Sequence, residues 1–329
     1  MAESILNVRN LKKWFPLRRG KLSKLFGRGT QEYVKAVDGV SFNINEGEVF
    51  GLAGESGCGK TTTGKTILRL IEPTYGEVYF KGVNMMTISE REMKPMRRRM
   101  QIIYQDPYDS LNPRMTVETI ISEPIRVHKL AEGREREEKL LQALEDVELT
   151  PPEEFLHRYP HELSGGQRQR VAVARALVLN PIFIVADEPV SMLDVSIRAE
   201  ILNLMLKLRE ERGISYLFIT HDLAIARHMC DRIAIMYLGK IVELGPTDKI
   251  VRQPIHPYTT ALIMVVPVPD PTLTRPPIKI TGQVPTPINP PQGCRFHPRC
   301  PYAKEICKKE EPSFTEIEKD HFVACHLFG

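Results

Sequence analysis

The sequence lacks any apolar run long enough to form a membrane-spanning helix. Such a helix needs about 18 consecutive apolar residues, whereas the best stretch, Ala261 to Val268, is much shorter and contains Pro267. The first ten residues also lack the basic and apolar regions of a secretory leader. We therefore expect a cytosolic protein with no transmembrane segment.

The sequence also lacks a large excess of charge of one sign. It has 45 Lys and Arg residues against 41 Asp and Glu residues, a net charge of +4, which is too small to indicate a nucleic-acid-binding protein. The basic residues concentrate instead between Arg9 and Arg28, where no acid occurs. We interpret this segment as a solvated loop, with contact to phosphates or anionic lipid as the alternatives.

The order of the predicted elements favours an α/β fold. Apolar strand patterns at 5–8, 34–44 (a strand pair), 48–53, 101–104, 182–186 and 215–220 alternate with helical periods at 60–71, 89–97, 117–179 and 196–212. Ser89 with Glu92 predicts a capping box, and Gly213 is placed to end the last helix. Because strands alternate with helices, we expect a mostly parallel, doubly covered sheet.

A phosphate-binding loop is predicted between the strand at 48–53 and the helix that follows. Residues 54–61 match G-x-x-x-x-G-K-[ST] in the strand–loop–helix context that this motif requires. Glycines let backbone N–H groups turn toward an anion, the helix dipole and Lys60 add positive charge, and the Thr61 hydroxyl can ligate Mg²⁺. The bland alternative is a glycine turn with a surface lysine. The candidate nucleotide-binding residues are Gly54, Glu55, Ser56, Gly57, Cys58, Gly59, Lys60, Thr61 and Thr62, and we expect Cys58 to make the activity thiol-sensitive.

Two acids end the buried strand at 182–186. A buried carboxylate is costly unless something compensates its charge, and Mg²⁺ would do so at the carboxyl end of a parallel strand. We therefore assign Asp187 to Mg²⁺ and Glu188 to accepting a proton from an attacking water. Capping of a helix by the two acids is the alternative.

The segment Leu163 to Gln167, continuing to Arg170, resembles the signature of ATP-binding-cassette (ABC) ATPases. The resemblance covers residues 5 to 252 and implies a P-loop NTPase (RecA-like) cassette with an antiparallel β subdomain and a helical insertion at about 107–175. It implies that Ser164, Gly165, Gly166 and Gln167 contact ATP on the P-loop of a second cassette, as does Asp194 of the D-loop. It also gives Gln105 the role of coupling Mg²⁺ and water to the insertion, and His221 that of sensing the γ-phosphate.

For the adenine base, the family stacks an aromatic side chain upstream of the P-loop. Phe15 aligns best with that position, and Trp14 and Tyr33 are its rivals. An aromatic residue in such a place can equally serve simple packing.

Nine prolines between residues 267 and 291 precede a cysteine-rich tail with Cys294, Cys300, Cys307 and Cys325. This tail and the segment His256 to Thr259 resemble the C-terminal extension of oligopeptide and dipeptide permease ATPases, whose four cysteines can hold a [4Fe–4S] cluster. Zinc, with help from His297 and His326, and unligated thiols are the other interpretations. Because the tail has too few apolar residues for a core of its own, we expect a cluster to act as a staple.

The resemblance implies a cassette over residues 1–253 and an extension over 254–329. It implies an ATP-binding and ATP-hydrolysing subunit that energises a di- or oligopeptide importer by dimerisation of two cassettes. Its partners would be a second, homologous or identical ATPase subunit, two membrane permease subunits and, indirectly, an extracytoplasmic solute-binding protein, with no nucleic acid. The chain would lie on the cytoplasmic face of the membrane. Import of nickel or oligosaccharides, or a soluble ABC ATPase of DNA repair or translation, remain alternatives.

Overall fold

The computed structural model describes residues 3–17, 31–265, 280 and 282–328. The chain divides into two compact units. We call the one that comprises Met1–Glu3, Asn45–Glu48 and Ile88–Phe218 the helical unit. The other, which comprises Ser4–Ile44, Val49–Thr87 and Ile219–Gly329, is called the sheet unit.

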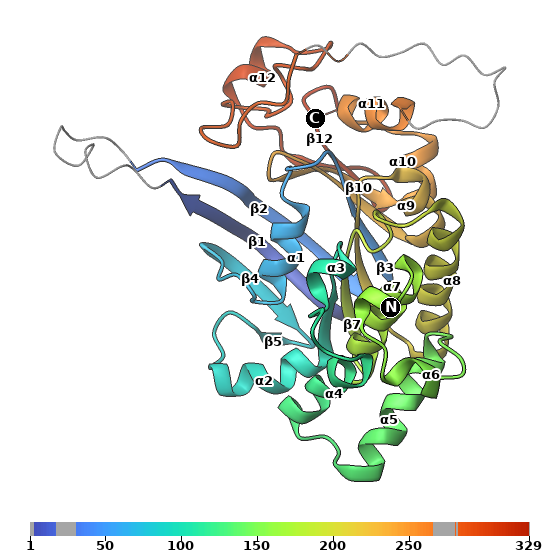
Figure 1. The fold of residues 1–329 in the computed structure, drawn as a ribbon. Helices are drawn as coiled ribbons and strands as arrows, with labels where there is room; N and C mark the ends of the chain where they lie inside the picture. Colours follow the sequence, from blue (N-terminus) through green and yellow to red (C-terminus); the bar gives the residue numbers. More distant parts are fainter. Residues whose placement is uncertain (1–2, 18–30, 266–279, 281, 329) are drawn as a thin grey trace, which may run out of the picture. The chain divides into compact units, whose positions relative to one another are not determined.

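The sheet unit begins with a four-stranded sheet in the order β2-β1-β4-β5 (Figure 1). Strand β1 runs antiparallel to β4, with Leu6 opposite Phe80, and β4 runs antiparallel to β5. The expected antiparallel β subdomain is therefore present. The strands are β1 Ser4–Pro16, β2 Tyr33–Asn45, β4 Tyr75–Phe80 and β5 Val83–Asn84.

Strands β1 and β2 differ from their predictions. The residues at 34–44 form one long strand rather than a pair, and β1 extends past Val8 to Pro16. The interpretation of the basic segment as a loop from Arg9 onward is therefore wrong as far as Pro16, and its residues 18–30 lie outside the described part. The chain accommodates the basic side chains in a strand by laying them over aromatic rings: Arg9 lies 4.9 Å from the Tyr79 ring centre, and Lys13 lies 4.9 Å from that of Phe15.

A second sheet of the sheet unit runs β11-β12-β10-β9-β3. Strands β3 and β9 are parallel, whereas β9, β10, β12 and β11 follow one another in antiparallel pairs. The C-terminal hairpin thus extends a sheet that starts beside the P-loop. The strands are β3 Val49–Ala53, β9 Arg232–Tyr237, β10 Lys240–Pro246, β11 Phe314–Glu318 and β12 His321–Ala324; the helices of the unit are α1 Lys60–Ile67, α9 Leu223–Met229, α10 Thr247–Arg252, α11 Pro257–Val265 and α12 Glu305–Lys309.

This arrangement explains how a tail without a core of its own is held. Val323 of β12 is buried opposite Glu243 of β10, and Phe296 is buried against the rings of Tyr237 and Tyr258. The tail therefore shares the apolar core of the sheet unit, and its cysteines are not its only attachment.

The helical unit contains the expected insertion. Between residues 107 and 177 the chain forms α3 to α7, and the parallel pair β6 and β7 places Met100 opposite Phe183. Its elements are α2 Glu90–Arg99, β6 Met100–Ile103, α3 Pro107–Ser110, α4 Val117–His128, α5 Gly133–Asp146, α6 Glu153–Leu156, α7 Gly165–Leu177, β7 Phe183–Asp187 and α8 Val195–Arg212, followed by β8 Ser215–Thr220, whose last two residues belong to the sheet unit.

Both predicted helix ends are confirmed. The Ser89 hydroxyl accepts the N–H of Glu92, and the Glu92 carboxylate accepts the N–H of Ser89, which is a complete capping box. Gly213 ends α8 with φ 66°, in the left-handed region that favours glycine.

No helix in the described ranges is both long enough and apolar enough to cross a membrane.

Candidate functional site

The P-loop, residues 54–61, lies between the fully buried strand β3 and the start of α1. Two of its glycines are sterically required. A Cβ atom at Gly59, where φ is 110°, would lie 2.0 Å from the carbonyl oxygen of Ala36, and one at Gly54 would lie 2.2 Å from that of Met236. Because any side chain at these positions would collide with backbone, only glycine lets the loop wrap closely at the end of the strand.

Lys60 is folded over the loop that precedes it. Its buried ammonium group donates to the carbonyl oxygens of Gly54, at 2.8 Å, and Glu55, at 3.2 Å. The cation is thus held within the phosphate-binding motif by bonds that an anionic ligand can replace. Burial raises the pKa of the Cys58 thiol, against the influence of Lys60, so the structure does not support the expected thiol reactivity of Cys58.

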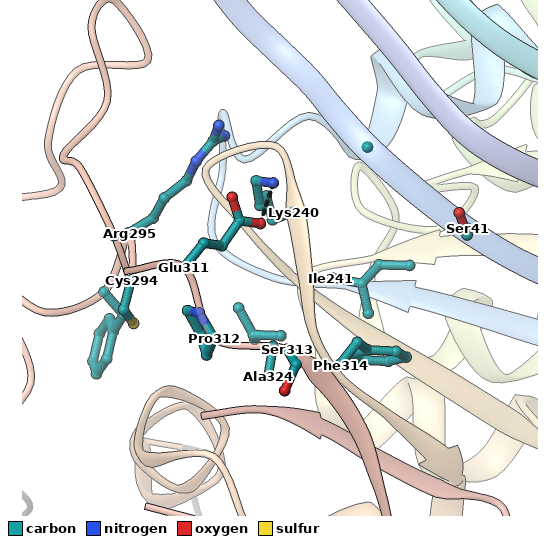
Figure 2. Close-up of a pocket in the computed structure, with 14 residues that line it drawn as sticks. Ser41, Lys240, Ile241, Cys294, Arg295, Glu311, Pro312, Ser313, Phe314 and Ala324 are labelled. Carbon is teal, nitrogen blue, oxygen red and sulfur yellow. Dashed lines mark hydrogen bonds and ion pairs between the residues drawn. The ribbon is translucent and has the colours of Figure 1, made fainter. Parts of the chain in front are cut away.

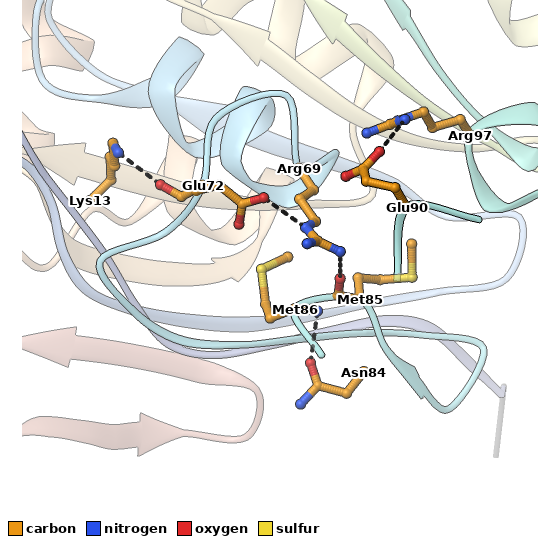
Figure 3. A network of polar contacts seen from close by, with 8 residues as sticks. All are labelled: Lys13, Arg69, Glu72, Asn84, Met85, Met86, Glu90 and Arg97. Carbon is orange, nitrogen blue, oxygen red and sulfur yellow. Dashed lines mark hydrogen bonds and ion pairs between the residues drawn. The ribbon is translucent and has the colours of Figure 1, made fainter. Parts of the chain in front are cut away.

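The far end of α1 is anchored to neighbouring strands (Figure 3). Arg69 donates to the Glu72 carboxylate at 2.9 Å and to the Met85 carbonyl at 3.3 Å, while Lys13 of β1 donates to the Glu72 carbonyl at 2.8 Å. These bonds fix the helix that follows the P-loop on the antiparallel sheet.

Glu55 of the P-loop is bonded by residues about 200 positions away. The hydroxyl of Tyr258 in α11 accepts the Glu55 backbone N–H at 2.9 Å. Arg299 of the tail grips both carboxylate oxygens of Glu55, at 2.8 and 3.1 Å. Sequence reasoning missed both partners, although Tyr258 lies in a segment that it had singled out and Arg299 directly precedes Cys300.

In the helical unit, Glu188 directly follows the buried strand β7. Its φ of 47° is unusual for a residue other than glycine, and such strain is typical of functional positions. The amide nitrogen of Gln105 donates to the Glu188 carboxylate at 3.3 Å, so the structure brings together two of the three residues predicted to be catalytic. Asp187 is 4% exposed and lies at the end of the same strand.

The signature segment begins helix α7. Ser164 caps the helix: its hydroxyl accepts the Gln167 N–H at 3.2 Å, and the Gln167 side chain accepts the Ser164 N–H at 3.0 Å. Gly165 and Gly166 form the first turn, and a Cβ atom at Gly166 would press on Ile197 of α8 at 2.7 Å. The unpaired N–H groups of a first turn attract anions, and Ser164 is exposed at that end.

Comparison with known proteins identifies the family. Residues 37–191 match the family described as ABC transporter, and residues 242–307 match the oligopeptide/dipeptide transporter C-terminal region. The oligopeptide transport ATP-binding protein AppF of Bacillus subtilis is 50% identical over 99% of this chain and 98% of its own length. The dipeptide transport ATP-binding protein DppF of Haemophilus influenzae is 46% identical over 98% of this chain and 96% of its own. The chain belongs to the ABC transporter family, in its oligopeptide and dipeptide branch.

Solved structures agree with this assignment. A dimeric structure of the ATP-binding cassette MJ0796, in a post-hydrolysis state bound to ADP and Pi, is 32% identical, with a TM-score of 0.62. It covers 74% of this chain and 98% of that one. The predicted RecA-like ABC cassette is therefore confirmed as the fold.

Arg198 of α8 bonds the segment 191–194, which is predicted to form the D-loop. Arg198 donates to the carbonyl of Leu193 at 2.7 Å and to that of Ser191 at 3.4 Å. Asp194 is the residue before α8 and is exposed. Two apolar neighbours, Met192 and Val195, are 61% and 80% exposed.

The remaining nucleotide candidates lie in the sheet unit. His221 is exposed beside the cap of α9, where the Asp222 carboxylate accepts the N–H of Ala224 at 2.8 Å. Phe15 is 36% exposed, whereas Trp14 is partly buried, contacts the rings of Tyr33 and Tyr75 and donates its indole N–H to Asp38 at 3.0 Å. Phe15, Trp14 and Tyr33 thus lie in one neighbourhood, and their ranking for adenine stays a prediction.

The four tail cysteines interact electrostatically with one another. Burial, together with the thiols of Cys307, Cys325 and Cys300, raises the pKa of Cys294 to about 11, although the Phe296 N–H lowers it. The pKa values of Cys300 and Cys325 are also raised, mainly by burial. Within the described ranges, no three His, Cys, Asp or Glu side chains are grouped so that they could hold a metal ion.

A cavity of about 410 Å³ lies beside the tail (Figure 2). Lys240 and Glu311 form an ion pair at its wall, and Cys294, Arg295 and Phe314 also line it. It contains no residue of the P-loop, so it is not the nucleotide site.

Proposed function

We propose that this chain is the ATP-hydrolysing subunit of an importer of di- or oligopeptides. The observation that carries the proposal is the pair formed by Gln105 and Glu188, at the end of a buried strand in a chain with an intact P-loop. The peptide substrate is supported by the match of residues 242–307 and by the relatives that transport peptides.

The P-loop would bind the phosphates of ATP. The backbone of residues 54–59 turns its N–H groups toward the anion, and Lys60 leaves the carbonyls of Gly54 and Glu55 for the phosphate oxygens. Thr61, Gln105 and Asp187 would hold Mg²⁺, which would supply positive charge against the phosphates. Glu188 accepts the proton of the attacking water, and His221 contacts the γ-phosphate.

A second cassette would complete the site. Ser164, Gly165, Gly166, Gln167 and Asp194 would contact ATP bound to the partner's P-loop. The exposed Met192 and Val195 beside the D-loop support such an interface, as does the dimer reported for a related cassette. Because the γ-phosphate would contact both cassettes, ATP favours the closed pair more than ADP does, and hydrolysis opens it.

The importer would contain two permease subunits and a second ATPase subunit, homologous or identical to this chain, on the cytoplasmic face of the membrane. A solute-binding protein would act on the other side. Residues 1–253 would form the cassette, with the helices at 107–175 docking on the permease, and residues 254–329 the extension. Co-purification from native membranes tests this assembly: we expect two permease subunits, and recovery of ribosomes or DNA repair factors instead would refute import.

A Glu188→Gln variant tests the catalytic assignment. It should lose ATP hydrolysis, keep ATP binding and accumulate an ATP-held dimer, because only the proton acceptor is removed. The matched control is Glu210→Gln, which changes an exposed carboxylate on α8. A Glu188→Gln protein that hydrolyses ATP at the wild-type rate would show that the base lies elsewhere.

We also propose that Cys294, Cys300, Cys307 and Cys325 hold a [4Fe–4S] cluster. The thiols of Cys307, Cys325 and Cys300 contribute to the raised pKa of Cys294, although burial contributes most. Each thiolate would bind a different iron atom of such a cluster, so its ligands need not lie as close together as those of a single ion. A zinc site with histidine is the alternative: His297 Nδ1 and His326 Nε2 bond the backbone carbonyls of Cys294 and Glu310, and a zinc-bound histidine commonly makes such a bond through its second ring nitrogen. A cluster would supply cross-linking of the tail.

Iron and sulfide analysis of anaerobically purified protein tests the cluster. We expect roughly four iron atoms per chain and broad visible absorption, lost in Cys307→Ser and retained in Cys230→Ser, which changes a buried thiol outside the tail. A colourless protein with stoichiometric zinc would replace this proposal by the zinc site.

A further inference from the structure

Every polar group of Glu55 has a partner, and two of these partners come from outside the P-loop. Its carbonyl oxygen accepts from Lys60 and from the backbone N–H of Cys58. Its own N–H is taken by Tyr258 and its carboxylate by Arg299. The loop is therefore bonded both by its own Lys60 and by two residues outside it, Tyr258 of α11 and Arg299 of the tail.

The two outside partners are themselves held rigidly. Tyr258 is 0% exposed, and its ring packs on Tyr237 at 4.7 Å and on Phe296 at 5.4 Å between ring centres. The Arg299 guanidinium lies over the rings of Tyr237 and Phe296, at 5.7 and 5.9 Å. Hydrogen bonds from such fixed groups constrain Glu55 more than bonds from mobile surface side chains would.

The bonds between Arg299 and the Glu55 carboxylate are also stronger than ordinary neutral hydrogen bonds. Arg299 binds the carboxylate with two parallel N–H···O bonds, and charge-assisted pairs of this geometry are about twice as strong as neutral hydrogen bonds. Arg299 is 8% exposed, so solvent screens the pair less than it screens a surface ion pair. Glu55 of the P-loop thus bonds a residue that lies beyond residues 1–253.

We propose that Tyr258 and Arg299 are positioning residues for nucleotide binding: they hold Glu55 so that the P-loop is preformed for phosphate. The C-terminal region thereby sets the ATP affinity of the cassette. The inference rests on the proposed binding of ATP at the P-loop. Neither residue is assigned a contact with the nucleotide, so both act through Glu55 and should change affinity more than turnover.

Equilibrium binding of ATP and ADP to the full-length chain tests the inference. In Arg299→Met we expect the Kd for both nucleotides to rise roughly five- to ten-fold, the value of one or two hydrogen bonds, with kcat at saturating ATP largely kept. Tyr258→Phe keeps the ring and removes only the acceptor of the Glu55 N–H, so its Kd should rise by a smaller factor.

Two comparisons separate positioning from general loosening of the tail. In the cycle of Arg299→Met, Glu55→Gln and the double variant, the double variant should bind ATP no more weakly than the weaker single variant, because both changes break one contact. The control Glu311→Gln removes a tail ion pair with Lys240 away from the P-loop (Figure 2) and should leave Kd unchanged.

The possible outcomes separate failure of the positioning role from failure of the proposed ATP-binding function. A wild-type chain that binds no ATP contradicts the proposed function. If the wild type binds ATP, the positioning role is overturned by an Arg299→Met variant whose Kd for ATP is unaltered. It is also overturned if Arg299→Met raises the Kd by the same factor in the Glu55→Gln background as in the wild type. The melting temperature of each variant is also measured without nucleotide. A variant whose melting temperature falls while its Kd stays unchanged would show a purely structural role and would likewise overturn the positioning role.

Discussion

His256 makes the stability of the sheet unit depend on pH. It lies directly before α11, where its Nδ1 accepts the Tyr258 N–H at 3.1 Å and its carbonyl accepts the Thr260 N–H. Burial lowers the pKa of His256 to about 4, although the Glu243 carboxylate raises it. A proton on Nδ1 would also remove the acceptor that caps the helix, so the folded state requires a neutral ring.

The size of the effect follows from the two pKa values. The unfolded chain protonates this histidine below about pH 6.5, whereas the folded chain does so only near pH 4. In this window the unfolded state binds more protons, so the free energy of unfolding falls as the pH falls. Between about pH 7.5 and pH 5 the loss is about 2 kcal/mol, or about 3 °C in melting temperature for a chain of this length.

Thermal unfolding of wild type and His256→Asn at the two pH values measures this contribution. Asparagine can accept the same N–H at a helix start and does not titrate, so the variant should lose about 2 kcal/mol less than the wild type on acidification. Ionisable groups that do not contact residue 256 contribute equally in the two proteins and cancel in the comparison. Equal acid losses in the two proteins would refute the reasoning.

Three further substitutions probe other parts of the chain. Gly59→Ala should abolish ATP binding, since its Cβ would collide with the Ala36 carbonyl; a variant that binds normally would show that the loop can relax. Ser89→Ala should lower the free energy of unfolding by about 1 kcal/mol through loss of the capping box, and unaltered denaturant unfolding would contradict it. Gln105→Glu would place a second carboxylate against Glu188, and the two like charges would repel each other. The pH profile of hydrolysis should move upward, and an unmoved profile would exclude contact between the two groups during turnover.

Local features of this fold were predictable from the sequence. Strand β3, the P-loop and α1 follow one another as expected, and the capping box at Ser89 and the end of α8 at Gly213 are both confirmed. Each depends on residues a few positions apart, so the short-range pattern contains the information. The family could be recognised for the same reason, because its motifs are contiguous in the chain.

The predictions that were wrong or incomplete concern long-range pairing. Strand β1 continues through its basic residues because β4 pairs with it as far as Lys12 opposite Tyr75, around a bulge at which Gly76 approaches Asn10. Likewise, the tail has too few apolar residues for a core of its own, and the strand that it joins, β10, lies about 80 positions earlier. Local composition contains no sign of such partners.

Contiguous motifs alone determined that this protein is an ABC ATPase of the peptide-transporter branch. The phosphate loop, the two acids and the signature each consist of residues that are adjacent in the sequence. Only the tertiary structure decided that Tyr258 and Arg299 grip the P-loop and that Gln105 bonds Glu188. The physical reason is that these are hydrogen bonds between residues 83 to 244 positions apart. Such bonds form only once packing has brought their segments together.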